Sequence, residues 1–139
     1  MNAGFDVTII TRNDSATKHR EDVPLIRTEY SLSALTEALT GQDAIVCVVG
    51  PPGIGLQSTF IDAAEAAGAK RFIVDDFGWG PNPRSLPEFG QIHALRRLGW
   101  DRAKARADAN PGLTWTGIST GNPIDWVRAS SLRHVYDVG

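Results

Sequence analysis

The stretch LQSTFIDAAEAAGAKRFIVD, residues 56–75, contains a helix pattern that leads directly into a strand pattern. In its first part, apolar residues recur every three or four positions up to Gly68, which is typical of an amphipathic helix that ends at a glycine. The second part, RFIVD, is a short apolar run that predicts a buried strand. A helix followed at once by such a strand is the repeating unit of a parallel α/β sheet. The apolar helix face consists of Leu56, Phe60, Ala63, Ala64 and Ala67.

Further strand patterns lie on both sides of this stretch. Residues 7–11 (VTIIT), 44–49 (AIVCVV) and 113–119 (LTWTGIS) are short apolar or β-branched runs, and residues 24–30 (PLIRTEY) form a weaker one. Their apolar residues mostly follow one another instead of alternating with polar residues, which is typical of strands that are covered on both faces. Strands of this kind occur mostly in parallel sheets.

Two more helix patterns complete the order of elements. The segment SLSALTEALTG, residues 31–41, carries leucine and alanine on one face, and Ser31 or Ser33 fits its N-cap position. Residues 90–108 form a third, basic helix pattern. Strands and helices that alternate in this way predict a right-handed series of βαβ units. We therefore expect an α/β protein with an open, doubly wound parallel sheet.

The composition is that of one soluble globular domain. The chain has 139 residues, of which 42% are hydrophobic and 22% are charged, and its formal net charge is -2. This weak charge would not attract nucleic acid or an anionic membrane. The longest apolar run, residues 44–49, is far shorter than the roughly 20 residues that span a bilayer. We expect a cytoplasmic protein without nucleic-acid or membrane partners, in which the single cysteine, Cys47, is buried.

Ligands of open parallel sheets bind beyond the carboxyl ends of the strands. These ends are the points in the sequence at which a strand pattern gives way to glycine, proline or polar residues. Together they predict one crevice, in which the chemistry of the protein would take place. The junctions are residues 11–12, 49–51, 75–77 and 119–121.

Four segments resemble the NmrA-like and isoflavone-reductase-like branch of the atypical short-chain dehydrogenases, particularly its fungal members. The most specific one is AGAKRFIVDDFG at residues 67–78, which is similar to the AGVKRFIPSEFG pattern of that family. The resemblance implies a Rossmann domain that binds NADP(H). It also implies either the reduction of small phenolic or enone-like substrates or a non-catalytic role as a redox sensor bound to transcription factors. The segments are residues 3–12, 35–50, 56–80 and 110–126.

Arg12 follows the strand pattern at residues 7–11, and the resemblance implies that it binds the 2′-phosphate of NADP. The planar guanidinium group suits a phosphate, whereas NAD-binding domains usually carry an acidic residue at this point. Asp14 follows two residues later, and its carboxylate would oppose the phosphate. The alternative interpretation of Arg12 is an ordinary solvated arginine.

Gly50, Pro51 and Phe77 are the other cofactor contacts that the resemblance implies. Gly50 and Pro51 match the position where the backbone meets the nucleotide, since glycine has no Cβ to prevent a close approach. A plain turn after the strand is the alternative. Phe77 and the two residues before it match the Ser-Glu-Phe of the family, which lies near the nicotinamide. Because adjacent strand residues point to opposite faces, we expect neither paired-carboxylate catalysis nor a metal site at Asp75 and Asp76.

Three features depart from the pattern of that family. The strand and the G-x-x-G-x-x-G loop that hold the pyrophosphate would lie before residue 1. The GPPGIG segment at residues 50–55 is no substitute for that loop, because its prolines remove N–H donors. The catalytic lysine of the family would fall at about Gln91 or Ile92, and His93 is the nearest titratable group. The sequence also ends soon after the segment that enters the substrate domain of the family.

We therefore interpret residues 1–139 as a partial NAD(P)-binding, NmrA-like domain that is truncated at both ends and has no substrate domain. The ancestral function would be that of an oxidoreductase for small organic substrates, with NADP(H) binding weak or lost in this chain. The alternatives are a non-catalytic domain that senses dinucleotide or binds a protein partner, and an inactive fragment from an incomplete gene model. A sheet edge exposed by a missing strand would favour oligomers.

Two further expectations concern the third helix pattern and its neighbourhood. Its basic residues are interleaved with Asp101 and Asp108, which indicates a solvated surface and not a phosphate-binding face. Trp100 in this helix and Trp115 in the last strand are large and mainly apolar, and each follows or precedes an apolar run. We expect both tryptophans in the core or in an interface.

Overall fold

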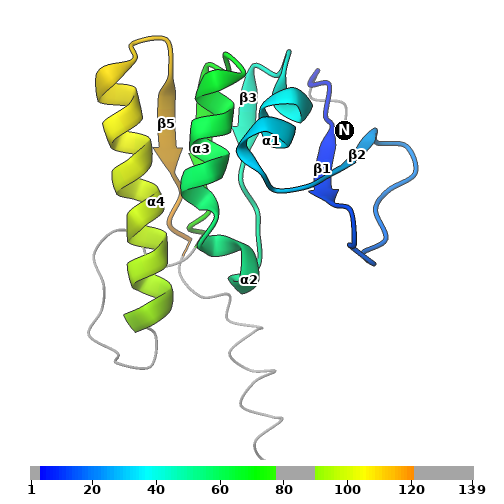
Figure 1. Cartoon of the computed structure of the whole chain (residues 1–139), viewed down its shortest axis with the longest axis horizontal. Coiled ribbons are helices and arrows are strands. Elements are labelled where there is room, and N and C mark those ends of the chain that lie inside the picture. Colours follow the sequence, from blue (N-terminus) through cyan, green and yellow to red (C-terminus); the bar gives the residue numbers. More distant parts are fainter. Residues whose placement is uncertain (1–3, 78–89, 121–139) are drawn as a thin grey trace, which may run out of the picture.

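The computed structural model describes residues 4–77 and 90–120, and its strands and helices alternate along the chain (Figure 1). The strands and helices predicted from the sequence are all present, with ends that differ by a few residues from the predicted ones. One short helix after the third strand was not predicted. In chain order the elements are β1 (Ile9–Arg12), β2 (Leu25–Thr28), α1 (Leu32–Leu39), β3 (Ala44–Val46), α2 (Pro51–Ile54), α3 (Gln57–Ala66), β4 (Arg71–Val74), α4 (Gly90–Ala109) and β5 (Thr114–Gly117).

All paired strands run parallel, which confirms the predicted α/β class. β1 pairs with β2 in a two-stranded sheet, and β3, β4 and β5 form a three-stranded sheet with β4 in the centre. The register places Ile9 opposite Leu25 in the first sheet and Phe72 opposite Trp115 in the second. Within the described residues no pairing joins β1 to β3. The strands therefore form two sheets that meet without hydrogen bonds between them.

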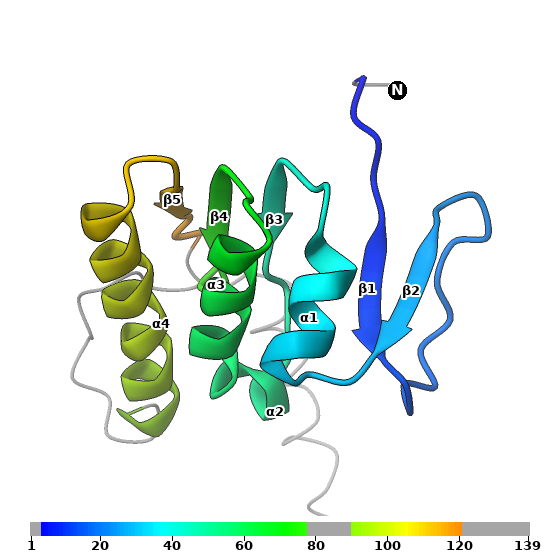
Figure 2. The same ribbon diagram turned by 45° about the horizontal axis from the view of Figure 1, so that its top comes forward.

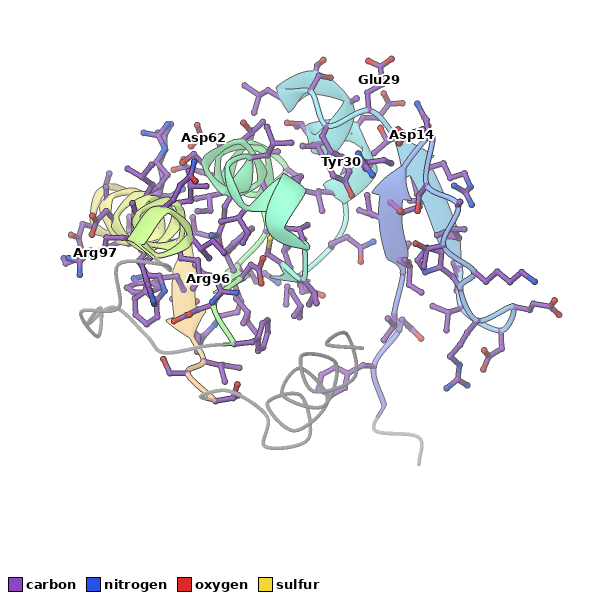
Figure 3. The ribbon with its side chains drawn as sticks, turned by 90° about the horizontal axis from the view of Figure 1, so that it is seen from below. Asp14, Glu29, Tyr30, Asp62, Arg96 and Arg97 are labelled. Atoms are coloured by element: carbon purple, nitrogen blue, oxygen red, sulfur yellow. The ribbon has the colours of Figure 1, made fainter. Side chains whose placement is uncertain are left out.

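Helices α1, α3 and α4 lie on the same side of the strands (Figure 3). The side chain of Ser31 accepts a hydrogen bond from the Ala34 N–H at 3.4 Å, which identifies Ser31 and not Ser33 as the N-cap of α1. Gly41 and Gly68, just after α1 and α3, adopt φ angles of +83° and +79°. Glycine reaches these angles at little cost, so the chain turns sharply from each helix toward the next strand.

The hydrophobic core lies between the three-stranded sheet and the helices. Phe72, in the middle of β4, is completely buried, and Tyr30 meets Phe60 edge to face with ring centroids 4.9 Å apart. Cys47 is buried in the same cluster as a free thiol, as predicted, and burial is the main cause that raises its pKa to about 12. A thiol in this state is a poor nucleophile. Further members of the cluster are Leu35, Leu39, Ile61, Ala63, Ala64, Ala69, Val74, Ala103 and Leu113.

An ion-pair network joins helices α3 and α4. Arg102 donates hydrogen bonds of 2.8 and 2.6 Å to the carboxylate of Asp62, and Arg106 donates one of 3.0 Å to the same group. Burial alone would raise the pKa of Asp62, but the hydrogen bonds from the two arginines outweigh it and hold that pKa below its usual value. Arg102 and Arg106 face α3, and their side chains are still 39% and 36% exposed, so they lie at the border of the expected solvated surface. Lys104 fits the expectation, since its exposed side chain pairs with Asp108 along the helix.

Helix α4 approaches β5 closely at two aromatic residues. Trp100 and Trp115 meet edge to face with centroids 5.0 Å apart, and both pack against the core, which confirms the prediction for them. Gly117, at the end of β5, lies against the indole of Trp100, and a Cβ at this position would overlap atoms of the ring. The absence of a side chain at Gly117 thus permits the short distance between α4 and β5.

Candidate functional site

The parallel strands place their carboxyl ends on one edge of the molecule, the carboxyl edge, where α2 also lies (Figure 2). The chain leaves β1 at Arg12, β3 at residues 47–50, β4 at residues 75–77 and β5 at residues 118–120. The junctions predicted from the sequence therefore share this edge, except that Gly121 lies outside the described residues. The break between β1 and β3 separates Arg12 from the other three junctions.

Arg12 ends β1 with an exposed side chain. Its Nε lies 3.6 Å from a carboxylate oxygen of Asp14, so the acidic residue that the sequence places two positions later does approach the guanidinium. Arg27 of β2 donates a hydrogen bond of 2.8 Å to the carbonyl of Ser15 and so holds the turn that follows β1. Because the pair of Arg12 and Asp14 is exposed, solvent screens it and its net stabilisation is small. The guanidinium keeps N–H donors that this single ion pair does not use.

Gly50 and Pro51 form the turn from β3 into α2. Gly50 is extended, with φ of -69° and ψ of 174°, and Pro51 is the first residue of α2. Proline suits this position, because the first N–H groups of a helix have no acceptor within the helix. The Gly53 N–H donates to the Gly50 carbonyl at 2.8 Å, and a Cβ on Gly53 would lie 2.9 Å from the Cβ of Val49. The turn is therefore packed tightly against the segment that follows β3. Both predicted residues lie on the carboxyl edge, and their contact with a nucleotide stays a prediction.

Gln57 and Asp75 are buried polar residues behind the carboxyl edge. The side-chain oxygen of Gln57, a residue only 1% exposed, accepts a hydrogen bond of 2.6 Å from the Asp75 N–H. This bond ties the start of α3 to the end of β4. Within the described part of the chain, neither Nε2 of Gln57 nor Oδ2 of Asp75 has a hydrogen-bond partner. Burial is the main cause that raises the pKa of Asp75, and the charge of Arg96 offsets part of the effect.

Asp76 is also buried but has different neighbours. Its carboxylate lies 3.8 Å from Arg96 of α4 and accepts a hydrogen bond of 3.4 Å from the Ser119 hydroxyl. Figure 3 shows Arg96 on the side of α4 that faces the strands. The two adjacent carboxyl groups therefore contact different groups, as the alternation of strand residues predicts.

Phe77 has an unusual backbone conformation. Its φ is +38°, and among the described residues it is the one non-glycine residue with a positive φ. A residue with a Cβ adopts this backbone conformation at a cost of roughly 1–2 kcal/mol. The hydroxyl of Thr120 donates a hydrogen bond of 2.6 Å to the Phe77 carbonyl and links the chain after β5 to the chain after β4. Phe77 is half-buried on the carboxyl edge, and its contact with a nicotinamide stays a prediction.

The sequence analysis did not identify Gln57 and Arg96 as important residues. A signal for Gln57 exists, because it shares the inward helical face of Phe60, and a polar residue on such a face needs a partner. Arg96 lies three and seven positions before Gly99 and Ala103, which are the buried residues of α4. The same spacing that locates the buried face of each helix therefore points to both residues.

The positions at which a catalytic lysine was sought lie in the first turn of α4. Gln91 is exposed there, while Ile92 and His93 are half-buried. Across residues 4–77 and 90–120, no three His, Cys, Asp or Glu side chains are grouped so that they could hold a metal ion. No helix in those ranges has the length and apolar character needed to cross a membrane.

The raised pKa of Asp75 makes a prediction for stability. A carboxyl group whose pKa is higher in the folded state favours folding below its unfolded pKa, and this contribution is lost as the pH rises through the folded pKa. We expect the free energy of unfolding, measured with urea at a series of pH values, to fall over that interval. Asp75→Asn should flatten the fall, whereas the exposed control Asp6→Asn should keep the original profile. If Asp75→Asn shows the same dependence of the free energy of unfolding on pH as the original chain, the fall does not arise from Asp75.

Parallel strands that are joined by helices and share a carboxyl edge define an α/β protein of the Rossmann-like class, in which ligands bind beyond those strand ends. Residues 1–137 match the model of the NAD(P)H-binding family. Because this match covers nearly the whole chain, the protein belongs to the NAD(P)H-binding family. The predicted dinucleotide partner is thereby confirmed at the level of NAD(P)H.

Two curated relatives of this chain are named as fungal oxidoreductases. Oxidoreductase poxI of Penicillium oxalicum is 64% identical over 124 residues, which cover 89% of this chain and 40% of the relative. Oxidoreductase aprR of Aspergillus flavus is 34% identical over 123 residues, which cover 84% of this chain and 40% of the relative. The chain thus spans about 40% of the length of these relatives.

Solved structures confirm the Rossmann-like fold. A proposed epimerase from Bacteroides thetaiotaomicron has a TM-score of 0.56 and 24% identity over 85% of this chain and 60% of its own. A proposed NADH-flavin reductase from Streptococcus pneumoniae has a TM-score of 0.56 and 21% identity over 84% of this chain and 60% of its own. At these levels of identity the likeness concerns the fold of the chain.

Proposed function

We propose that the chain is the NmrA-like, NADP(H)-binding part of an oxidoreductase that acts on small phenolic or enone-like substrates in the cytoplasm. The observation that carries the proposal is the exposed guanidinium of Arg12 at the carboxyl end of β1. An exposed cation at this place suits the 2′-phosphate, which distinguishes NADP from NAD. The family and the oxidoreductase relatives support a nicotinamide dinucleotide as the ligand.

The other contacts follow from the order of the strands. In this proposal the nucleotide lies along the carboxyl edge, with its 2′-phosphate at Arg12. The protein backbone contacts the nucleotide at Gly50 and Pro51. The nicotinamide end lies near Phe77, whose carbonyl is already fixed by Thr120. The cofactor would supply hydride, and the residues of this chain would bind and orient it. No residue of the chain is assigned as an acid or a base.

We also propose that residues 1–139 alone bind NADP(H) weakly. The pyrophosphate of a dinucleotide is normally held by backbone N–H groups at the start of a helix. The turn at residues 50–55 is a poor candidate for this role, because the Gly53 N–H already bonds to the Gly50 carbonyl and Pro51 has no N–H. In addition, Asp14 competes with the phosphate for Arg12.

The test is calorimetric titration of the chain with NADPH and with NADH. We expect NADPH to bind more tightly than NADH, and Arg12→Gln to weaken NADPH binding by about tenfold, since a charge-assisted hydrogen bond contributes roughly 1.5–3 kcal/mol when well formed. NADH binding should change little. Equal losses for both nucleotides would contradict the assignment of Arg12 to the 2′-phosphate.

Two variants serve as controls for this titration. Arg20→Gln removes another exposed arginine, which is also paired with an aspartate, Asp22, in the loop after β1, and it should leave NADPH binding unchanged. Asp14→Asn removes the competing carboxylate and should tighten NADPH binding. Submicromolar binding of NADPH by the original chain would overturn the proposal of weak binding. The role of Arg12 would still be decided by the comparison of Arg12→Gln with its two control variants.

A non-catalytic role in sensing dinucleotide is the second candidate function. It is favoured by the sequence around the expected catalytic lysine, because no lysine occurs between Lys70 and Lys104 and Gln91 is neutral. Under this proposal the chain binds NADP(H) without turnover and responds by binding a protein partner. Nucleotide binding combined with oxidation of NADPH by an enone-like substrate would exclude it.

A further inference from the structure

The Thr120 hydroxyl continues the pairing of β5 with β4 beyond the ends of both strands. The last paired residues are Val74 in β4 and Gly117 in β5. Further along both segments, the Thr120 hydroxyl donates a hydrogen bond of 2.6 Å to the Phe77 carbonyl. These two residues are 43 positions apart in the sequence, which is also the separation of the paired strand residues. The segments that leave β4 and β5 therefore stay in register up to residues 77 and 120.

The N–H groups that follow β4 are used for other bonds, because the chain bends there. The Asp75 N–H donates to the side-chain oxygen of Gln57 at 2.6 Å. The Asp76 N–H donates back to the Val74 carbonyl at 2.9 Å, a bond that spans three residues as in a γ-turn. Since both of these donors are engaged away from β5, a side chain of the segment after β5 makes the next connection between the two segments.

Phe77 is held in a backbone conformation that it does not favour. Its φ of +38° lies in the left-handed region, which a residue with a Cβ keeps only where its surroundings stabilise it. Asp76 before it is buried, lies 3.8 Å from Arg96 and accepts a hydrogen bond from Ser119. The bond from Thr120 acts on Phe77 itself. Because Thr120 is exposed, its hydroxyl can be removed without opening the core.

We propose that Thr120 is a positioning residue for the nicotinamide end of the cofactor. Its hydroxyl fixes the Phe77 carbonyl and thereby the conformation of residue 77. This residue lies on the carboxyl edge, where the proposed function puts the nicotinamide. Thr120 acts through Phe77 and needs no contact of its own with the nucleotide. The inference rests on the proposed function, and it concerns the nicotinamide end and not the 2′-phosphate at Arg12.

The test compares two ligands that differ in the nicotinamide. NADPH carries this group, whereas 2′-phospho-ADP-ribose has a hydroxyl group in its place. In calorimetric titrations of the 139-residue chain, Thr120→Val should weaken NADPH binding by about fivefold, the effect of one hydrogen bond. Binding of 2′-phospho-ADP-ribose should change by less than about twofold. Equal losses for both ligands would mean that Thr120 supports the fold in general, and they would overturn the proposal.

Two variants separate the hydroxyl from other effects of the substitution. Thr120→Ser keeps the hydroxyl and should bind NADPH as the original chain does. Thr114→Val removes the same kind of bond at the other end of β5, where the Thr114 hydroxyl donates to the Lys70 carbonyl at 2.8 Å. This control should leave the binding of both ligands unchanged, and circular dichroism confirms that each variant folds. A loss in Thr120→Ser or in Thr114→Val as large as that in Thr120→Val would overturn the role of the hydroxyl.

A double variant tests whether Thr120 acts through Phe77. Phe77→Ala should weaken NADPH binding selectively, and the addition of Thr120→Val should cause little further loss, because both changes affect the same contact. Additive losses would show that Thr120 acts independently of Phe77 and would overturn the proposal. NADPH binding that does not respond to Thr120→Val would overturn this inference alone. If neither ligand binds at millimolar concentration, the proposed function fails, and this inference fails with it.

Discussion

Phe72→Ala is expected to lower the free energy of unfolding by about 3–5 kcal/mol, as large core truncations do. Phe72 is 0% exposed and lies in the middle of β4, the central strand of the three-stranded sheet. Its ring belongs to the cluster that joins this sheet to α1, α3 and α4. The large expected loss combines the removal of apolar surface from the core with the cavity left behind, because neighbours on two strands and a helix layer relax only in part.

Phe5→Ala is the matched control, since Phe5 is 80% exposed and the chemical change is the same. Urea denaturation should show a change of less than about 0.5 kcal/mol for it. If Phe72→Ala does not fold, Phe72→Leu provides the measurement, with an expected loss below about 1.5 kcal/mol because the volume is largely conserved. Similar losses for Phe72→Ala and Phe5→Ala would contradict the location of the core.

The order and type of the main elements were predictable from the sequence because they depend on local periodicity. The helix that ends at Gly68 and the strand that follows it are examples, since the apolar spacing and the glycine are visible within one segment. The unpredicted helix α2 begins at Pro51, where two prolines and three nearby glycines suggested a turn. A single helical turn of four residues leaves no periodicity to detect.

The division into two sheets depends on pairing between distant residues, and local patterns carry little information about it. Among the described residues β1 and β3 are not paired, and the expectation of a missing strand, which the resemblance to the NmrA-like family implies, stays a prediction. The strands were predicted to be longer than they are in the structure. Residues 47–49 were expected in the strand that became β3, but this strand, which pairs with β4 alone among the described residues, ends at Val46.

The candidate site was predictable in its location but not in its contacts. Arg12, Gly50, Pro51 and Phe77 all lie on the carboxyl edge because the ends of parallel strands share one edge. The positive φ of Phe77 and the hydrogen bond from Gln57 to the Asp75 backbone arise from packing between α3, α4 and the sheet. Such tertiary constraints leave only a weak trace in the sequence, in this case a glutamine on an apolar helix face.

Gly99→Ala is expected to destabilise the protein by about 3 kcal/mol, from overpacking and from a broken buried hydrogen bond. Gly99 is buried in α4 at the point where the helix meets the side chain of Gln57. A Cβ on residue 99 would overlap the Gln57 amide nitrogen and would lie 2.5 Å from its Cδ. A shift of the buried amide away from this Cβ would disturb the hydrogen bond of 2.6 Å that its oxygen accepts from the Asp75 N–H. The glycine therefore sets the spacing between α4 and α3 and, through Gln57, the position of the residues after β4.

Gly90→Ala is the control within the same helix, because a Cβ at Gly90 meets no atom of the described residues within 4 Å. This change should alter stability by less than about 1 kcal/mol, the difference in helix propensity between the two residues. Gln57→Ala should itself be destabilising, since it leaves the buried Asp75 N–H without its acceptor. In the double variant Gly99→Ala with Gln57→Ala, the overlap disappears, so its loss of stability should be smaller than the sum of the single losses. Additive losses would show that Gly99 and Gln57 act independently, and the spacing of α4 from α3 would then need another explanation.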